Sequence, residues 1–244
     1  MSPEKESLLN CERLCVGYAG RSAVLAEEFS FALIPGEVVA LMGENGSGKS
    51  TLLKTFAGSI PALSGSAMLC RKPLGEWSAR ERACRIALVR MAVSAPDRMT
   101  VREFVGLGRS PYSGMLDGRS EEDVRIIESA MGMLDVDLFA DRPVIELSDG
   151  ERSRVYLAQA VAQQVKVLLL DEPNAFLDIP RSHALFRLLK TLAESRQMGI
   201  IVSTHSVEYA ERYCDRIMVI DKRQVRVAPA KEARGSGLLD WTGA

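Results

Sequence analysis

The segment EVVALMGENGSGKST at residues 37–51 constrains the fold more strongly than any other part of the chain. Its apolar first half predicts a buried strand, and the residues after the last glycine predict a helix. A Gly-x4-Gly-Lys-Ser spacing in this context is typical of a phosphate-binding loop, because backbone N–H groups and the helix N-terminus converge on phosphate oxygens. Lys49 supplies a positive charge for the outer phosphates, and Ser50 can bind Mg²⁺. A glycine-rich strand-to-helix turn without a ligand is the alternative interpretation.

Further strand-like runs alternate with helical patterns, which predicts a mainly parallel sheet covered on both faces. Such runs occupy about 165–173 and 199–205, and each leads into a helical pattern. Between about residues 92 and 165 the strand signal fades, so we expect a helical lobe inserted into the sheet domain. Residues 215–227 predict a terminal hairpin, and we expect a single domain over 1–230 followed by a loose tail over 231–244.

Two acidic residues and a histidine follow the predicted strands. Asp171 ends the run VLLLD, where a buried carboxylate is costly unless it serves a cation, so it is a natural partner for Mg²⁺. Glu172 is then the candidate for directing the attacking water, and His205 can hold the terminal phosphate. An acidic turn and a structural histidine are the alternatives, and the phosphate loop in the same chain favours the catalytic interpretation.

The sequence LSDGE at residues 147–151 precedes a helical pattern and leaves two interpretations open, a phosphate contact and a helix cap. The hydroxyl of Ser148 and the backbone N–H of Gly150 suit the first interpretation. Asp149 suits the second, because the helix dipole favours a negative charge at a helix start. We expect its carboxylate to turn away from phosphates or to be neutralised by Arg152 or Arg154, since carboxylate and phosphate repel each other.

Composition sets broad limits on the class of protein. With 244 residues, 47% of them hydrophobic, and a formal net charge of -1, the chain can bury a full core and lacks a bulk charge that favours nucleic acid. The five cysteines lack metal-ligand spacing, and their odd number suits a reducing compartment. No signal-like start and no run of about 18 apolar residues occurs, so we expect a soluble, cytoplasmic chain that sits on a membrane partner.

The motifs GENGSGKST, LSDGE, LLLDEP, FLD and finally His205 occur in an order and spacing that resemble the ATP-binding cassette (ABC) ATPases. The resemblance covers the chain up to about residue 230. It implies an α/β P-loop NTPase fold with a mainly parallel core sheet, an N-terminal antiparallel β portion and an inserted helical subdomain. It also implies a homodimer, in which the signature turn of one subunit closes over ATP and Mg²⁺ held by the other.

The resemblance also assigns roles to individual residues. The expected ATP contacts are Tyr18, Gly43, Glu44, Asn45, Gly46, Ser47, Gly48, Lys49, Ser50 and Thr51. The expected catalytic residues are Lys49, Glu172 and His205, and the expected Mg²⁺ ligands are Ser50 and Asp171. The signature turn that acts in trans comprises Ser148, Asp149, Gly150 and Glu151.

Three further positions are less sharply defined. Tyr18 resembles the aromatic residue that stacks on adenine, and surface packing is its alternative role. Asp178 resembles the acid of the dimer loop, and it also suits a helix cap. Met91 stands where the family usually has glutamine. A thioether is a poor Mg²⁺ ligand and cannot donate a hydrogen bond, which puts the usual metal contact of this loop in doubt.

Residues 99–114, MTVREFVGLGRSPYSG, resemble a stretch in the ATPases of importers for iron-siderophore complexes, haem and cobalamin, although a plain loop also explains them. We therefore expect a peripheral ATPase subunit at the cytoplasmic face of the cell membrane. Its expected partners are two membrane-spanning permease subunits and, indirectly, a substrate-binding protein. We expect no nucleic-acid partner. The alternatives are a soluble ABC ATPase in iron-sulfur cluster assembly and a nucleotide-gated regulatory subunit.

Overall fold

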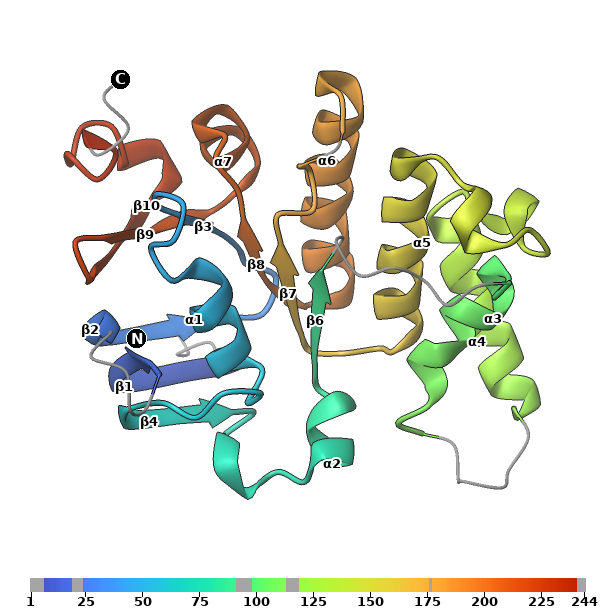
Figure 1. Cartoon of the computed structure of the whole chain (residues 1–244), viewed down its shortest axis with the longest axis horizontal. Helices are drawn as coiled ribbons and strands as arrows, with labels where there is room; N and C mark the ends of the chain where they lie inside the picture. The colour runs from blue at the N-terminus through green and yellow to red at the C-terminus, as the bar shows by residue number, and fades with distance from the viewer. Residues whose placement is uncertain (1–6, 19–23, 91–97, 113–118, 176, 241–244) are drawn as a thin grey trace.

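The computed structural model describes residues 7–18, 24–90, 98–112, 119–175 and 177–240. Figure 1 shows a central sheet with a smaller sheet to one side and a group of helices to the other. The central sheet has the strand order β10-β9-β3-β8-β7-β6, and the smaller sheet has the order β2-β1-β4-β5. The predicted α/β fold, with its N-terminal antiparallel portion and inserted helical subdomain, is therefore confirmed.

Parallel pairing dominates the central sheet. Its strands are β3 Val38–Met42, β6 Ile86–Arg90, β7 Val167–Asp171, β8 Gly199–Ser203, β9 Arg216–Asp221 and β10 Gln224–Pro229. Only β10 pairs antiparallel to its neighbour. The smaller sheet is antiparallel and consists of β1 Leu9–Gly17, β2 Val24–Leu33, β4 Ser64–Leu69 and β5 Lys72–Pro73. Because parallel strands end at one edge, the segments that follow β3, β7 and β8 meet there.

Most α helices begin at a Ser or Thr followed three residues later by an acid. The α helices are α1 Lys49–Phe56, α2 Ala79–Ala83, α3 Val101–Gly106, α4 Glu121–Met133, α5 Asp149–Ala162, α6 Ile179–Arg196 and α7 Val207–Tyr213. In α2 to α5 the hydroxyl of the cap residue accepts the third helical N–H, and the acid at that position accepts the N–H of the cap residue. Helices α3, α4 and α5 pack on one another and form the inserted subdomain, which we call the helical lobe.

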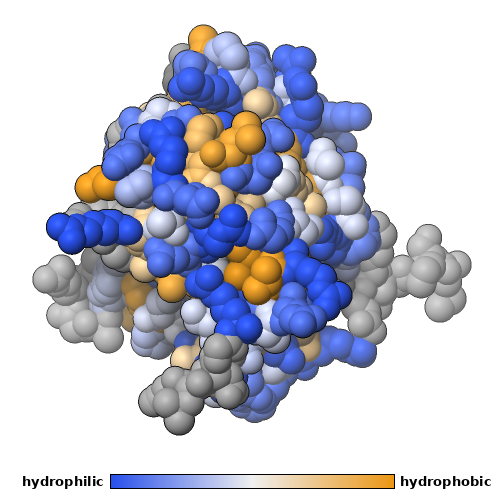
Figure 2. All heavy atoms as spheres, turned by 90° about the vertical axis from the view of Figure 1, so that its right-hand side faces the viewer, coloured by the Kyte–Doolittle hydropathy of each residue, from blue (hydrophilic) through white to orange (hydrophobic). Residues whose placement is uncertain are grey.

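Short 3₁₀ turns connect many of these elements. They occupy Leu74–Glu76, Leu107–Arg109, Asp137–Phe139, Val144–Glu146 and Ala230–Glu232. Three of them belong to the helical lobe, which Figure 2 shows from its outer side. That surface is mainly hydrophilic, with small separate hydrophobic groups. No helix in the described part of the chain is both long and apolar enough to cross a membrane.

The central strands bury side chains on both faces. Along β3, Val38 and Ala40 join the cluster that includes α5, α6 and α7, whereas Val39 and Leu41 join the cluster formed with α1 and the smaller sheet. Successive side chains of a strand point to opposite faces, so an uninterrupted apolar run fills both clusters at once. The two-sided cover predicted from the sequence is therefore confirmed.

The C-terminal region agrees with the sequence in one part and corrects it in another. The predicted hairpin is present as β9 and β10. The expectation of a loose tail is wrong for the described residues that follow it. Ala233, Leu238 and Leu239 are buried and join the cluster that includes α7. Arg234 also forms an ion pair with Glu211 of α7 at 2.7 Å. Tertiary contacts place these apolar side chains, and the short, largely polar sequence around them gave no sign that they would be buried.

Candidate nucleotide site

Lys49 lies at the centre of the glycine-rich loop that connects β3 to α1. It is 5% exposed, and its Nζ donates to the carbonyl oxygens of Gly43 at 2.8 Å and Glu44 at 3.0 Å. Burial lowers the pKa of Lys49, while the negative charges of Glu172 and Asp171 act in the opposite direction. An ammonium group has three donors, so this buried cation keeps one for an anion.

The surroundings of Lys49 fit a phosphate group. Gly43 has a φ of 144°, and a Cβ there would lie 2.5 Å from the carbonyl oxygen of Ile220, so only glycine fits. The Oγ of Ser47 is buried without a hydrogen-bond partner. Among the α helices of the described ranges, only α1 begins without a side-chain cap. The free N–H groups and the positive end of this helix dipole therefore face the loop, as an anion requires.

Asp171 and Glu172 follow one another at the end of β7, beside the end of β8. The hydroxyl of Ser203 donates to Asp171 Oδ1 at 3.0 Å and accepts the backbone N–H of Glu172 at 2.8 Å. The Oε1 of Glu172 lies 3.1 Å from the Nε2 of His205. Since Leu41, near the end of β3, pairs with Ser203, these groups share one sheet edge with the start of the loop. The structure thus brings together Lys49 and the predicted acid and histidine side chains.

Sequence reasoning missed Ser203. It is fully buried at the last position of β8, two residues before His205. A partly buried carboxylate also favours hydrogen-bond donors, so a search for a partner of Asp171 among polar residues at neighbouring strand ends would have found Ser203. Because Ser203 contacts both the carboxylate of Asp171 and the peptide of Glu172, it fixes the two acids relative to each other.

Tyr18 lies against the first turn of α1. Its hydroxyl is 3.2 Å from the Oγ1 of Thr51, and its side chain remains partly exposed, with a relative exposure of 38%. Thr51 itself is 7% exposed, so its side chain is largely covered. This position next to the phosphate loop is compatible with stacking on a base, and that stacking stays a prediction.

Ser148, rather than Asp149, is the helix cap in LSDGE, which corrects the capping role expected for Asp149. The hydroxyl of Ser148 donates to Glu151 Oε2 at 2.7 Å, and its backbone N–H donates to the same oxygen at 2.9 Å. These bonds hold the pKa of Glu151 below its usual range. Asp149 is the first residue of α5, where the dipole still favours its charge.

The charge of Asp149 has a cationic neighbour. Its Oδ1 lies 3.5 Å from an Nη of Arg152, which is one of the two arginines expected to neutralise it. Arg154 instead donates to backbone carbonyl oxygens of Leu134 and Asp135. A cavity of about 490 Å³ lies between α5 and α6, and Gly150 and Arg181 are among its lining residues. The signature turn therefore borders a cavity on the side that faces α6, where Arg181 lies against Gly150.

The remaining predicted positions can be placed only in part. Asp178 caps α6, because its Oδ1 accepts the backbone N–H of Arg181 at 2.9 Å. Met91 lies outside the described residues, and its neighbour Arg90 ends β6 opposite Asp171. The described ranges contain no group of three or more His, Cys, Asp or Glu side chains that could hold a metal. A Mg²⁺ ion bound here would therefore share oxygen ligands such as Ser50 and Asp171 with phosphate and water.

Comparisons with known proteins agree with this fold. The sequence model of the ABC transporter family matches residues 26–175. The achromobactin transport ATP-binding protein of Dickeya dadantii is 35% identical over 215 residues, which cover 88% of this chain and 79% of that protein. The hemin import ATP-binding protein of Rhodococcus jostii is 37% identical over 223 residues, which cover 91% and 75%.

A solved structure has the same fold. The dimeric structure of a bacterial ABC transporter cassette matches with a TM-score of 0.79 and 24% identity, over 91% of this chain and 98% of that one. The family match spans more than half of the present chain and includes the loop that is shaped for phosphate. The chain therefore belongs to the ABC transporter family, as a subunit that hydrolyses ATP for transport.

Proposed function

We propose that this chain drives an importer for iron-siderophore complexes, haem or cobalamin, with ATP hydrolysis at the sheet edge that holds Lys49. The contact between Glu172 and His205, with Asp171 held beside them by Ser203, is the observation that carries the assignment of the hydrolytic site. The cargo class is supported by the two relatives, which are named for achromobactin transport and hemin import.

Phosphate binding is assigned to the glycine-rich loop. The remaining donor of Lys49, the hydroxyl of Ser47 and the free N–H groups of α1 hold the phosphates of ATP, and Tyr18 stacks on the adenine. Ser50 and Asp171 hold Mg²⁺, since both supply the oxygen ligands that this ion prefers. When bound, Mg²⁺ neutralises negative charge on the outer phosphates.

Hydrolysis is assigned to Glu172 and His205. Glu172 accepts a proton from the attacking water as general base. His205, 3.1 Å from the carboxylate of Glu172, holds that carboxylate and orients the water toward the terminal phosphate. Ser203 keeps the two acids at a fixed separation, so that Asp171 serves the cation while Glu172 serves the water.

A second subunit completes the site. Ser148 and Gly150 of the partner, within the turn that also contains Asp149 and Glu151, close over the terminal phosphate, and Asp178 links the two sites. The dimeric state of the similar cassette supports this arrangement. In the chain described here the hydroxyl of Ser148 donates to Glu151, so on closure it exchanges this bond for one to the terminal phosphate. ATP hydrolysis therefore requires a homodimer.

The transporter requires membrane partners as well. Two permease subunits receive the ATPase dimer at the cytoplasmic face of the membrane, and a substrate-binding protein delivers cargo from the other side. The formal net charge of -1 gives no support to a nucleic-acid partner.

Uptake by cells tests the proposed cargo class. In the source organism, deletion of this chain is expected to abolish the uptake of a labelled iron-siderophore complex, haem or cobalamin. The wild-type chain should restore that uptake, and a Glu172→Gln variant should not. If the deletion strain takes up all three labelled compounds at the normal rate, the cargo assignment is wrong.

A further inference from the structure

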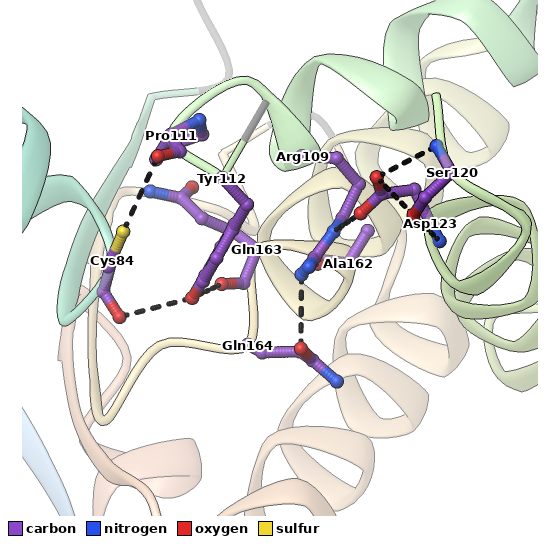
Figure 3. Close-up of polar contacts among 9 residues, drawn as sticks. All are labelled: Cys84, Arg109, Pro111, Tyr112, Ser120, Asp123, Ala162, Gln163 and Gln164. Carbon is purple, nitrogen blue, oxygen red and sulfur yellow. Dashed lines mark hydrogen bonds and ion pairs between the residues drawn. The ribbon is translucent and has the colours of Figure 1, made fainter. Parts of the chain in front are cut away.

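A buried arginine joins three elements at the base of the helical lobe (Figure 3). Arg109, at the end of the 3₁₀ turn Leu107–Arg109, is 6% exposed. Its Nε donates to Asp123 of α4 at 2.7 Å. Its Nη1 donates to the carbonyl oxygen of Ala162 at 2.9 Å and to Gln164 Oε1 at 3.0 Å. A cation at this position is favoured by the C-terminal end of the α5 dipole.

Tyr112 connects Arg109 to the central domain. The guanidinium of Arg109 lies 3.9 Å from the centre of the Tyr112 ring. The Tyr112 hydroxyl faces the carbonyl oxygens of Gln163 at 2.9 Å and Cys84 at 3.3 Å (Figure 3). Cys84 directly follows α2 and lies two residues before β6, outside the lobe. One side chain therefore contacts both the end of α5 and the segment that leads into the central sheet.

Further bonds connect the same two segments. Gln163 Nε2 donates to the carbonyl oxygen of Ala83 at 2.6 Å, and Arg80 Nε donates to that of Pro111 at 2.8 Å. Gly108 packs so closely on α5 that a Cβ there would collide with the carbonyl oxygen of Gln159. We call Arg109, Tyr112, Asp123, Gln163 and Gln164 the hub. It fixes the C-terminal end of α5 against the central domain.

The two ends of α5 have different surroundings. The C-terminal end lies in the hub, whereas Ser148 and Gly150 at the other end border the cavity of about 490 Å³ beside α6, with Arg181 of α6 next to Gly150. Helix α5 has 14 residues, which corresponds to a length of about 21 Å at 1.5 Å per residue. A rotation of about 10° around the hub would move the first turn by about 4 Å, which exceeds the length of a hydrogen bond.

We propose that Arg109 and Tyr112 are positioning residues for ATP hydrolysis, which set the angle of α5 and thereby place Ser148 for closure over the nucleotide of the partner subunit. The inference rests on the ATP-bridged dimer of the proposed function. Loosening the hub raises the free energy of closure without touching the phosphate loop or Glu172. Because ATP binding drives closure, a high ATP concentration compensates for the loss by mass action.

A Tyr112→Phe variant removes only the hydroxyl contacts and keeps the ring against Arg109. We expect its half-saturating ATP concentration for hydrolysis to rise about fivefold, the size that one net hydrogen bond gives. The kcat at saturating ATP should stay within about twofold of wild type. Tyr213→Phe is the matched control, because it removes a tyrosine hydroxyl contact with His183 inside the central domain. This control should leave the ATP dependence unchanged.

The outcomes separate a positioning role from a purely structural one. If Tyr112→Phe lowers the melting temperature but titrates with ATP as wild type does, or if it lowers kcat alone, the inference is overturned. An Arg109→Lys variant keeps the charge and loses the forked contacts, so it should shift the ATP dependence further in the same direction. A folded Arg109→Lys protein whose ATP dependence equals that of wild type would also overturn the inference.

The same samples distinguish this inference from the proposed dimer. Size-exclusion chromatography with ATP of the Glu172→Gln variant tests the dimer itself. If that variant dimerises and Tyr112→Phe still titrates as wild type, only the hub inference fails. If it stays monomeric, the ATP-bridged dimer fails, and with it the closure step that the inference assigns to the hub, whatever the ATP dependence of Tyr112→Phe.

Discussion

The phosphate loop and the signature turn, which form the two sides of the predicted catalytic interface, are held in place in different ways. At the phosphate loop, Lys49, Asp171 and His205 are placed by the ends of adjacent parallel strands, and buried Ser203 ties two of those ends together. At the signature turn, Ser148 begins a helix whose far end lies in the hub and whose first turn borders a cavity. A sheet edge fixes its side chains within one register, whereas the angle of a helix depends on the packing around it. The first region is suited to chemistry and the second to closure.

The largest expected effect concerns the rigid region. Glu172→Gln should lower ATP turnover by about 100-fold or more, because it removes the proposed general base while keeping the shape of the side chain. ATP binding should remain, and ATP-dependent dimers should accumulate. Steady-state hydrolysis and size-exclusion chromatography measure the two effects, and Glu194→Gln on the exposed side of α6 is the control. Unchanged turnover would remove Glu172 from the catalytic role.

Ser203→Ala should produce the next largest loss of ATP turnover. It tests whether the sheet edge holds the two acids in fixed positions. Loss of its hydroxyl frees both the carboxylate of Asp171 and the N–H of Glu172, so we expect kcat to fall about tenfold through misplacement. Ser182→Ala, another buried serine, controls for stability. If kcat is unchanged while the melting temperature falls equally in both variants, Ser203 has only a structural role.

Asp149→Gly tests the signature turn and should have a smaller effect on ATP hydrolysis. Asp149 is exposed, and its pairing with Arg152 adds little to stability, so the fold should be intact. Removal of a negative charge from the turn that closes over the partner's phosphates should lower the half-saturating ATP concentration about threefold. Asp141→Asn, which removes an exposed charge elsewhere on the lobe, is the control. Weaker closure would instead show that Asp149 contributes favourably to the interface.

The smallest expected effect is a change in the acid stability of the lobe. The Arg109 hydrogen bond, with that of Ser120, holds the pKa of Asp123 below its usual range. Its stabilising contribution is therefore complete above the ordinary aspartate pKa of about 4 and is lost as pH falls through the lower value of the folded state. The difference in unfolding free energy between wild type and Asp123→Asn should be constant near neutral pH and shrink as the pH falls below about 5. Urea unfolding at several pH values measures it, and a difference that does not change with pH contradicts the Asp123 assignment.

The sequence predicted the site residues unevenly. Lys49, Asp171 and His205 were found because each follows or ends a buried apolar run, and strand ends converge in any parallel sheet. Ser203 was missed because a serine at a strand end has no sequence signal of its own. The cap of α5 was assigned to Asp149 and belongs to Ser148, since a carboxylate and a hydroxyl both suit a helix start and only the backbone decides which one is the cap. The tail was predicted to be loose because its two leucines lie among glycines and polar residues.

The sequence by itself determined the α/β fold, the phosphate loop and the family, because these depend on local periodicity and on spacing within short segments. Only the tertiary structure showed that Ser203 connects the two acids and that Leu238 is buried. It also showed that Arg109 and Tyr112 join the end of α5 to the start of β6. The hydrogen bonds among these contacts link residues 28 to 53 positions apart, and no local pattern records them. They depend on where the helical lobe rests against the sheet, which is decided by packing.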